Sequence, residues 1–167
     1  MIITQRLTLL PLNYEQLIKY TRCDGSLELE LKLNPSCRII TDELKDALEQ
    51  VILPNVADKK NNYLFSTIWV AISKTENIMV GDFCWYGEPN EAGEIEVGYG
   101  IHEGFQNKGY ITEIVCGAIQ WAKSQQNVNT VKASTTKINI ASFKVLEKNG
   151  FIKTEETDEL FHWSLKL

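Results

Sequence analysis

Residues 94–135 contain the feature that most restricts how this chain folds. The stretch "EIEVGYGI" has the pattern of a strand, and a short loop with two glycines, "HEGFQNKG", follows it. Residues 110–124 then repeat apolar side chains at helical spacing, and "VNTVKAST" returns to a strand pattern. A strand, a helix and a strand in this order predict one β–α–β crossover.

The remaining segments predict an α+β fold of the three-layer α/β type. Its central sheet is expected to be mixed and mostly antiparallel. Further strands are expected at residues 2–12, 63–73, 77–87, 151–157 and 160–167, and further helices at residues 14–21, from Thr41 onward and at residues 140–149. Asn13 and Asn139 are expected N-caps, and Gly150 is an expected left-handed cap. Residues 26–33 alternate like a strand but are good helix formers, so both assignments stay open. The length fits a single domain, residues 1–167.

The composition limits the partners of the protein. The formal net charge of −5 argues against general nucleic-acid binding, which needs a basic surface. The four cysteines form no C-x-x-C pair, so no metal site is expected, and the apolar runs around Cys84 and Cys116 predict burial. The N-terminus lacks a signal-peptide pattern, and the longest apolar run, near residues 68–72, is too short for a bilayer. We therefore expect a soluble, cytoplasmic protein without a nucleic-acid or membrane partner.

The glycine loop has the properties of an anion site. A P-loop needs Lys and Ser/Thr where Tyr110 and Ile111 stand, and a dinucleotide fingerprint needs glycine where Glu103 stands. What remains is Q-x-x-G-x-x at the start of a helix, where unpaired N–H groups and the helix dipole attract an anion. Gly109 allows a ligand close to the backbone, and Lys108 adds a cation. A pyrophosphate is the expected guest.

Three stretches resemble one known family, in the same order along the chain. "TQRLTLLPL" resembles its opening strand, "EVGYGIHEGFQNKGYITEIV" its acetyl-CoA motif with the core Q/R-x-x-G-x-G/A, and "NIASFKVLEKNGF" the segment that follows. The family is the GNAT superfamily of acetyl-CoA-dependent N-acetyltransferases, in its RimJ/RimL-like (ribosomal-protein-alanine N-acetyltransferase) branch. The last core position is Gly or Ala in the family and Ile111 here, and its place in the apolar helix face predicts a side chain turned into the core.

The resemblance implies which residues bind acetyl-CoA and which catalyse. The implied contacts to the pantetheine arm and the diphosphate are Tyr99, Gly100, Ile101, Gln106, Asn107, Lys108, Gly109, Tyr110, Ile111, Asn139 and Ser142. Glu96 is the implied base and has Glu94 on the same face, although a solvated face is the alternative for both. The family's proton-donating tyrosine is replaced by Leu146, so Ser142 is the implied acid, with helix capping or back-bonding as its alternative role. Tyr99 and Tyr110 are further candidates for the donor, with packing as their alternative role.

Several other residues are weaker candidates. His162 titrates near neutrality and is a possible proton shuttle, with a structural role as the alternative. Asp82 and Trp85 are candidates for an acceptor pocket beside the implied acetyl-CoA strand. Lys144 and Lys148 are within reach of coenzyme A phosphates or are solvated helix lysines.

The sequence therefore predicts an N-acetyltransferase that moves the acetyl group of acetyl-CoA directly onto a primary amine. The acceptor is a protein N-terminus or a small-molecule amine, and the reaction needs no metal. A non-catalytic acyl-CoA-binding or sensor module on the same fold is the alternative, because a fold does not fix a function. A monomer and a homodimer both fit the sequence.

Overall fold

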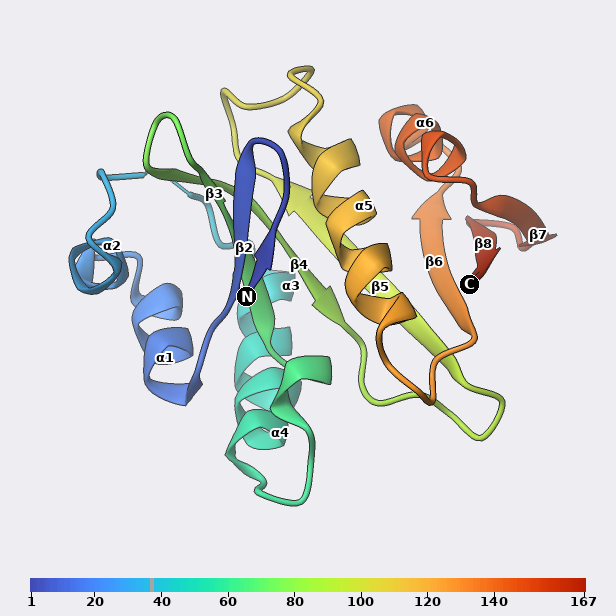
Figure 1. Ribbon diagram of the computed structural model, residues 1–167, viewed down its shortest axis with the longest axis horizontal. Helices are drawn as coiled ribbons and strands as arrows, with labels where there is room; N and C mark the ends of the chain where they lie inside the picture. Colours follow the sequence, from blue (N-terminus) through green and yellow to red (C-terminus); the bar gives the residue numbers. More distant parts are fainter. Residues whose placement is uncertain (37) are drawn as a thin grey trace.

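Eight strands form one sheet in the order β1-β2-β3-β4-β5-β6-β8-β7 in the computed structural model, which describes residues 1–36 and 38–167 (Figure 1). The strands are β1 (Ile2–Ile3), β2 (Leu7–Pro11), β3 (Ile68–Ser73), β4 (Ile78–Trp85), β5 (Glu94–Ile101), β6 (Thr130–Thr136), β7 (Ile152–Glu156) and β8 (Leu160–Lys166). The β5–β6 pair is parallel and the other neighbouring pairs are antiparallel. The mixed, mostly antiparallel sheet and its crossover are thus confirmed.

Helices lie on both faces of this sheet. They are α1 (Tyr14–Arg22), α2 (Ser26–Leu31), α3 (Asp42–Ala47), the π-helical η1 (Leu48–Ile52), α4 (Leu53–Ala57), the 3-10 helix η2 (Tyr63–Phe65), α5 (Tyr110–Lys123) and α6 (Ile140–Lys148). The open segment 26–33 is therefore mostly helical. Asn13 and Asn139 are the predicted N-caps, and Gly150 has the predicted left-handed φ of 84°.

Two sequence predictions are wrong in detail. The strand expected from residue 63 begins at Ile68, because the Asn62 side chain caps η2 by accepting a hydrogen bond from the Leu64 N–H. Cys116 is exposed, since it lies on the face of α5 that points away from the core, whereas Cys84 is half-buried.

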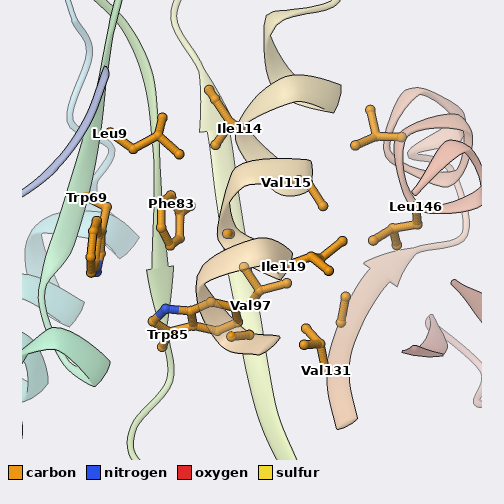
Figure 2. Close-up of a cluster of buried hydrophobic side chains, with 14 of the residues drawn as sticks. Leu9, Trp69, Phe83, Trp85, Val97, Ile114, Val115, Ile119, Val131 and Leu146 are labelled. Atoms are coloured by element: carbon orange, nitrogen blue, oxygen red, sulfur yellow. The ribbon is translucent and has the colours of Figure 1, made fainter. Parts of the chain in front are cut away.

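Two hydrophobic cores hold the layers together. The first lies between the sheet and the helices α5 and α6, and Figure 2 shows its central side chains. Leu146, at the position of the family's tyrosine, is fully buried in it. The second core lies on the opposite face, under α1, α2 and η1. Because side chains alternate along β5, Ile95 and Val97 point into the first core and Glu94 and Glu96 point to the other face.

A buried ion pair fixes the second layer. Glu28 and Arg38 are 4% and 8% exposed, and Arg38 Nη1 lies 2.5 Å from Glu28 Oε1. The Arg38 guanidinium also lies over the Tyr20 ring and donates to the Tyr20 carbonyl at 3.0 Å. The Tyr20 hydroxyl in turn donates to Asp82 Oδ2 on β4 at 2.9 Å. These contacts tie α1 and α2 to the strand next to β5.

Candidate active site

Strands β5 and β6 separate in the middle of the sheet. Their parallel pairing ends at Glu96 and Lys132, whereas β5 stays paired with β4 as far as Ile101. Among the described residues, the backbone of residues 97–101 therefore has no strand partner on its β6 side. Figure 1 shows the two strands diverging toward the end of the sheet where α6 begins. A free strand edge can hydrogen-bond an extended ligand that carries amides.

The loop at residues 102–109 presents its backbone to the same end. Gly104, Asn107 and Gly109 have φ values of 83°, 61° and 77°, which turn the chain sharply before α5. Within the described part of the chain, no carbonyl or side chain accepts a hydrogen bond from the N–H groups of residues 106–112. These free N–H groups and the dipole of the 14-residue helix α5 favour an anion at this point.

A groove of about 460 Å³ connects this loop with α6. Its walls include Ile101, Phe105, Gln106, Asn107, Gly109, Tyr110, Ile111, Ala141, Lys144 and Lys148. Ile111 is half-buried and packs against the core, in line with its predicted orientation. Lys144 and Lys148 of α6 bring positive charge to this groove, which the loop with the free N–H groups also lines. A free strand edge that leads into a cationic groove fits the pantetheine arm and the diphosphate of coenzyme A.

Arg6 is a positioning residue that the sequence analysis missed. Its Nε lies 2.6 Å from Glu113 Oε2 in the first turn of α5, and its Nη1 donates to the Lys108 carbonyl at 2.9 Å. Its guanidinium also lies over the ring of Tyr110, which is buried and so offers a ligand mainly its backbone. Arg6 thereby holds the loop and the helix start in one arrangement. A distance of 107 residues along the chain hides this pair from local patterns.

Tyr99 and Ser142 meet on the α6 side of the separated strands. Tyr99 Oη and Ser142 Oγ lie 2.7 Å apart, and the Asn139 side chain accepts from the Ser142 N–H at 3.1 Å. The capping role therefore belongs to Asn139, which leaves the Ser142 hydroxyl to Tyr99. Burial raises the pKa of Tyr99 more than the hydrogen bond to Ser142 lowers it. The phenol keeps its proton at neutral pH and can donate it.

Glu96 lies on the opposite face of β5 and is part of a hydrogen-bonded chain. Its Oε1 accepts from Ser134 Oγ at 2.8 Å, and Ser134 Oγ lies 3.1 Å from His162 Nδ1 on β8. All three side chains line a polar cavity of about 260 Å³. His162, a weaker sequence candidate, is thus joined to the implied base. Ser134 had no signal in the sequence.

Glu94 is already paired and so differs from Glu96. Its carboxylate accepts from Asn90 Nδ2 at 3.2 Å and lies 3.1 Å from Lys132 Nζ. The hydrogen bond from Asn90, followed by the one from Lys132, lowers the pKa of Glu94. A carboxylate with a lowered pKa is a weak base, so Glu94 is poorly suited to take a proton from an ammonium group.

Across residues 1–36 and 38–167, no three or more His, Cys, Asp or Glu side chains gather in a way that could hold a metal ion. None of the helices over the same residues is long and apolar enough to cross a membrane.

Comparison with known proteins identifies the family. Residues 6–152 match the family described as "Acetyltransferase (GNAT) domain", and the chain therefore belongs to it. The uncharacterized N-acetyltransferase YjdG of Bacillus subtilis (strain 168) is 35% identical over 95 residues. That match covers 57% of this chain and 56% of YjdG, so it spans little more than half of either protein.

Solved structures share the fold across nearly the whole chain. A GNAT-family acetyltransferase from Bacillus anthracis superimposes with a TM-score of 0.67 at 18% identity, over 99% of this chain and 97% of that one. The ribosomal-protein-S5-alanine acetyltransferase from Vibrio fischeri gives 0.68 at 18%, over 98% and 94%. Spermidine N-acetyltransferase from Vibrio cholerae, in complex with CoA and spermine, gives 0.67 at 14%, over 98% and 96%. These likenesses confirm the acyl-CoA N-acyltransferase fold predicted from the sequence.

Proposed function

We propose that this protein transfers the acetyl group of acetyl-CoA to a primary amine. The observation that carries the proposal is the opening between β5 and β6, which has Glu96 on one face and the Tyr99–Ser142 pair on the other. A base on the side of the amine and an acid on the side of the thiol are the two groups that aminolysis of a thioester needs. Acetyl-CoA is the typical cosubstrate of the family, and a solved relative holds CoA.

The cosubstrate site is the first part of this proposal. The free edge of β5 at Tyr99, Gly100 and Ile101 pairs with the amides of the pantetheine arm, near Asn139 and Ser142. The N–H groups of Gln106, Asn107, Lys108, Gly109, Tyr110 and Ile111 hold the diphosphate. Lys144 and Lys148 supply additional charge from α6. The site therefore orients the thioester at the opening between the two strands.

Glu96 and Tyr99 then carry the proton transfers. Glu96 takes a proton from the acceptor ammonium, and the amine lone pair attacks the thioester carbonyl carbon. As the new N–C bond forms and the C–S bond breaks, the Tyr99 hydroxyl, oriented by Ser142, gives its proton to the sulfur. The nitrogen loses its second proton to solvent, from which Tyr99 is reprotonated. Ser134 and His162 lead the proton of Glu96 to solvent.

The proposal is tested by release of the free coenzyme A thiol when the wild-type protein meets acetyl-CoA and a broad panel of primary amines. We expect thiol release that depends on the amine, and an acetylated amine of matching amount by mass spectrometry. A protein that binds acetyl-CoA but releases no thiol with any amine would instead be an acyl-CoA-binding module.

Tyr99→Phe tests the proton donor. Because the variant keeps the ring and loses the hydroxyl, we expect kcat to fall about 100-fold, the lower end of general acid–base effects, since a thiol with a pKa near 8.5 is a moderate leaving group. The matched control is Tyr14→Phe, a tyrosine exposed on α1 outside the site. Full activity of Tyr99→Phe together with a loss in Ser142→Ala would assign the acid role to Ser142 alone.

A further inference from the structure

A second cavity lies beside the candidate base and on the same face of the sheet. Its volume is about 280 Å³. One wall comes from residues 47–55 of the segment α3–η1–α4, and the other comes from residues 84–87 at the end of β4, together with Ser66. Nothing in the proposed cosubstrate site uses this space, because the coenzyme A groove lies between the loop and α6.

Tyr86 connects this cavity with Glu96. The Tyr86 N–H donates to the Glu96 carbonyl at 3.0 Å, which continues the β4–β5 ladder by one residue. Its phenol passes directly over Gly98, where an added Cβ would lie 2.4 Å from Tyr86 Oη. Burial, then Cys84 and then the Glu96 carboxylate raise the pKa of Tyr86. The cavity thus opens next to the point where β5 leaves β6.

The lining of this cavity is uncharged. It contains no Asp, Glu, Lys, Arg or His among the described residues, and burial raises the pKa of the Cys84 thiol to about 12, which keeps it neutral. The polar cavity on the other side of Glu96 contrasts with it, because that one is lined by Glu94, Lys132 and Glu155. A charged group in the uncharged cavity would lose its hydration without gaining a partner.

The local helix geometry points to a functional role for the same wall. The five residues Leu48–Ile52 form a π-helical segment between α3 and α4. Such segments are rare in proteins overall, and those that occur are often found at functional sites. Val51 and Ile52 of this segment line the cavity. Val51 is 53% exposed, although it is a large apolar residue, so an apolar surface faces the open side of the cavity.

We propose that this cavity binds an uncharged, apolar substituent carried next to the amino group of the acceptor. The inference rests on the proposed acetyltransferase function and names the acceptor class. The volume lies near the lower end of small-molecule pockets, roughly 300–1,000 Å³, and so suits one compact substituent. An apolar side chain on the first residue of a peptide is such a substituent, and so is the alkyl group of a small amine.

The first experiment ranks acceptors for the wild-type protein by kcat/KM, measured as thiol release. The peptides X-Gly-Ser-Gly carry Leu, Gly, Lys or Asp as X, and the free amines are isoamylamine and spermidine. We expect the Leu peptide to exceed the Lys and Asp peptides by at least about tenfold, since a methylene in an apolar pocket already changes rates by roughly 10- to 200-fold. If kcat/KM is far higher for the Leu peptide than for isoamylamine, the apolar substituent belongs to a peptide N-terminus. The reverse order identifies a small amine as the acceptor.

The second experiment alters the wall. Val51→Glu is expected to lower kcat/KM for the Leu peptide about tenfold, to leave the Gly peptide within about twofold, and to favour the Lys peptide. Ala47→Leu fills the cavity without adding charge. We expect it to lower kcat/KM for the Leu peptide more than kcat/KM for the Gly peptide. The matched control is Leu29→Glu, which changes an 80% exposed leucine on α2 that does not line the cavity.

Two results would overturn the assignment. In the first, spermidine or the Lys peptide is the best acceptor of the wild-type protein. In the second, Val51→Glu and Ala47→Leu lower kcat/KM equally for every peptide. In both cases an amine is still acetylated, so the proposed function stands and only the cavity assignment falls. If the protein binds acetyl-CoA in calorimetry but acetylates no amine of the panel, the proposed function and the cavity assignment are both wrong.

Discussion

Glu96→Gln is expected to lower kcat by about 10²- to 10⁴-fold, the range for loss of a general base. The amide is nearly the same shape as the carboxylate and can still accept the hydrogen bond from Ser134 Oγ, so packing on this face is preserved. What disappears is the ability to take a proton from the ammonium. Because the groove proposed for coenzyme A lies on the other side of β5, the Kd for acetyl-CoA should stay within about twofold of wild type.

Glu94→Gln is the matched control for this prediction. It makes the same substitution two residues away on the same face, at a carboxylate that already pairs with Lys132 and Asn90. We expect its kcat to stay within about threefold of wild type, because a carboxylate that is already paired and has a lowered pKa is a weak base and is not the group that takes the proton. Equal losses in both variants, or normal turnover in Glu96→Gln, would remove Glu96 from the role of base.

Arg38→Met is expected to destabilise the protein by about 3–5 kcal/mol at pH 7, the range for removal of one partner of a buried ion pair. The change leaves the Glu28 carboxylate buried without its guanidinium. It also removes the donor to the Tyr20 carbonyl and the cation over the Tyr20 ring. Urea unfolding followed by circular dichroism measures the difference in free energy of unfolding. The double variant Glu28→Gln, Arg38→Met should recover part of it, because no charge is then buried alone.

The pH dependence of this loss has a definite sign. Burial would raise the pKa of Glu28, but the hydrogen bond from Ser36, the hydrogen bond from its own backbone and the charge of Arg38 together hold the pKa below its ordinary value. A lowered folded-state pKa adds stability above the unfolded value of about 4.3, and this stability is lost as the pH falls through the folded value. The destabilisation by Arg38→Met should therefore shrink near pH 4, where the lone carboxyl takes up a proton. A loss that is the same at pH 4 and pH 7 would contradict the account.

Local patterns were sufficient for much of the fold. The apolar spacing of residues 110–124 predicts α5, and the caps at Asn13 and Asn139 place two helix starts correctly. These features depend on neighbours within a few residues, so a single sequence carries them. The segment at residues 63–67 is apolar like a strand, yet the Asn62 cap turns its first residues into a 3-10 helix. The competing turn chemistry decides there, and apolar content alone does not reveal it.

The candidate site depended more on distant contacts. The loop residues and Glu96 could be named from the sequence because a family pattern places them. The β5–β6 pairing ends at Glu96 and Lys132, although the strand pattern of β5 continues to Ile101 without a break, so the sequence does not show where the two strands separate. Arg6 with Glu113, and Ser134 with His162, join residues 107 and 28 positions apart, so no local pattern contains either pair. The π-helical segment at residues 48–52 likewise has no simple periodic signature.

Isothermal titration of the protein with acetyl-CoA tests the central claim, that the loop before α5 and the α6 lysines hold the coenzyme A diphosphate. For the wild-type protein we expect saturable binding to one site with a Kd of about 1 μM to 1 mM, the usual range for enzyme substrates. The double variant Lys144→Glu, Lys148→Glu should weaken acetyl-CoA binding at least about tenfold, and the weakening should diminish at high salt. A flat wild-type titration at millimolar acetyl-CoA would contradict the account.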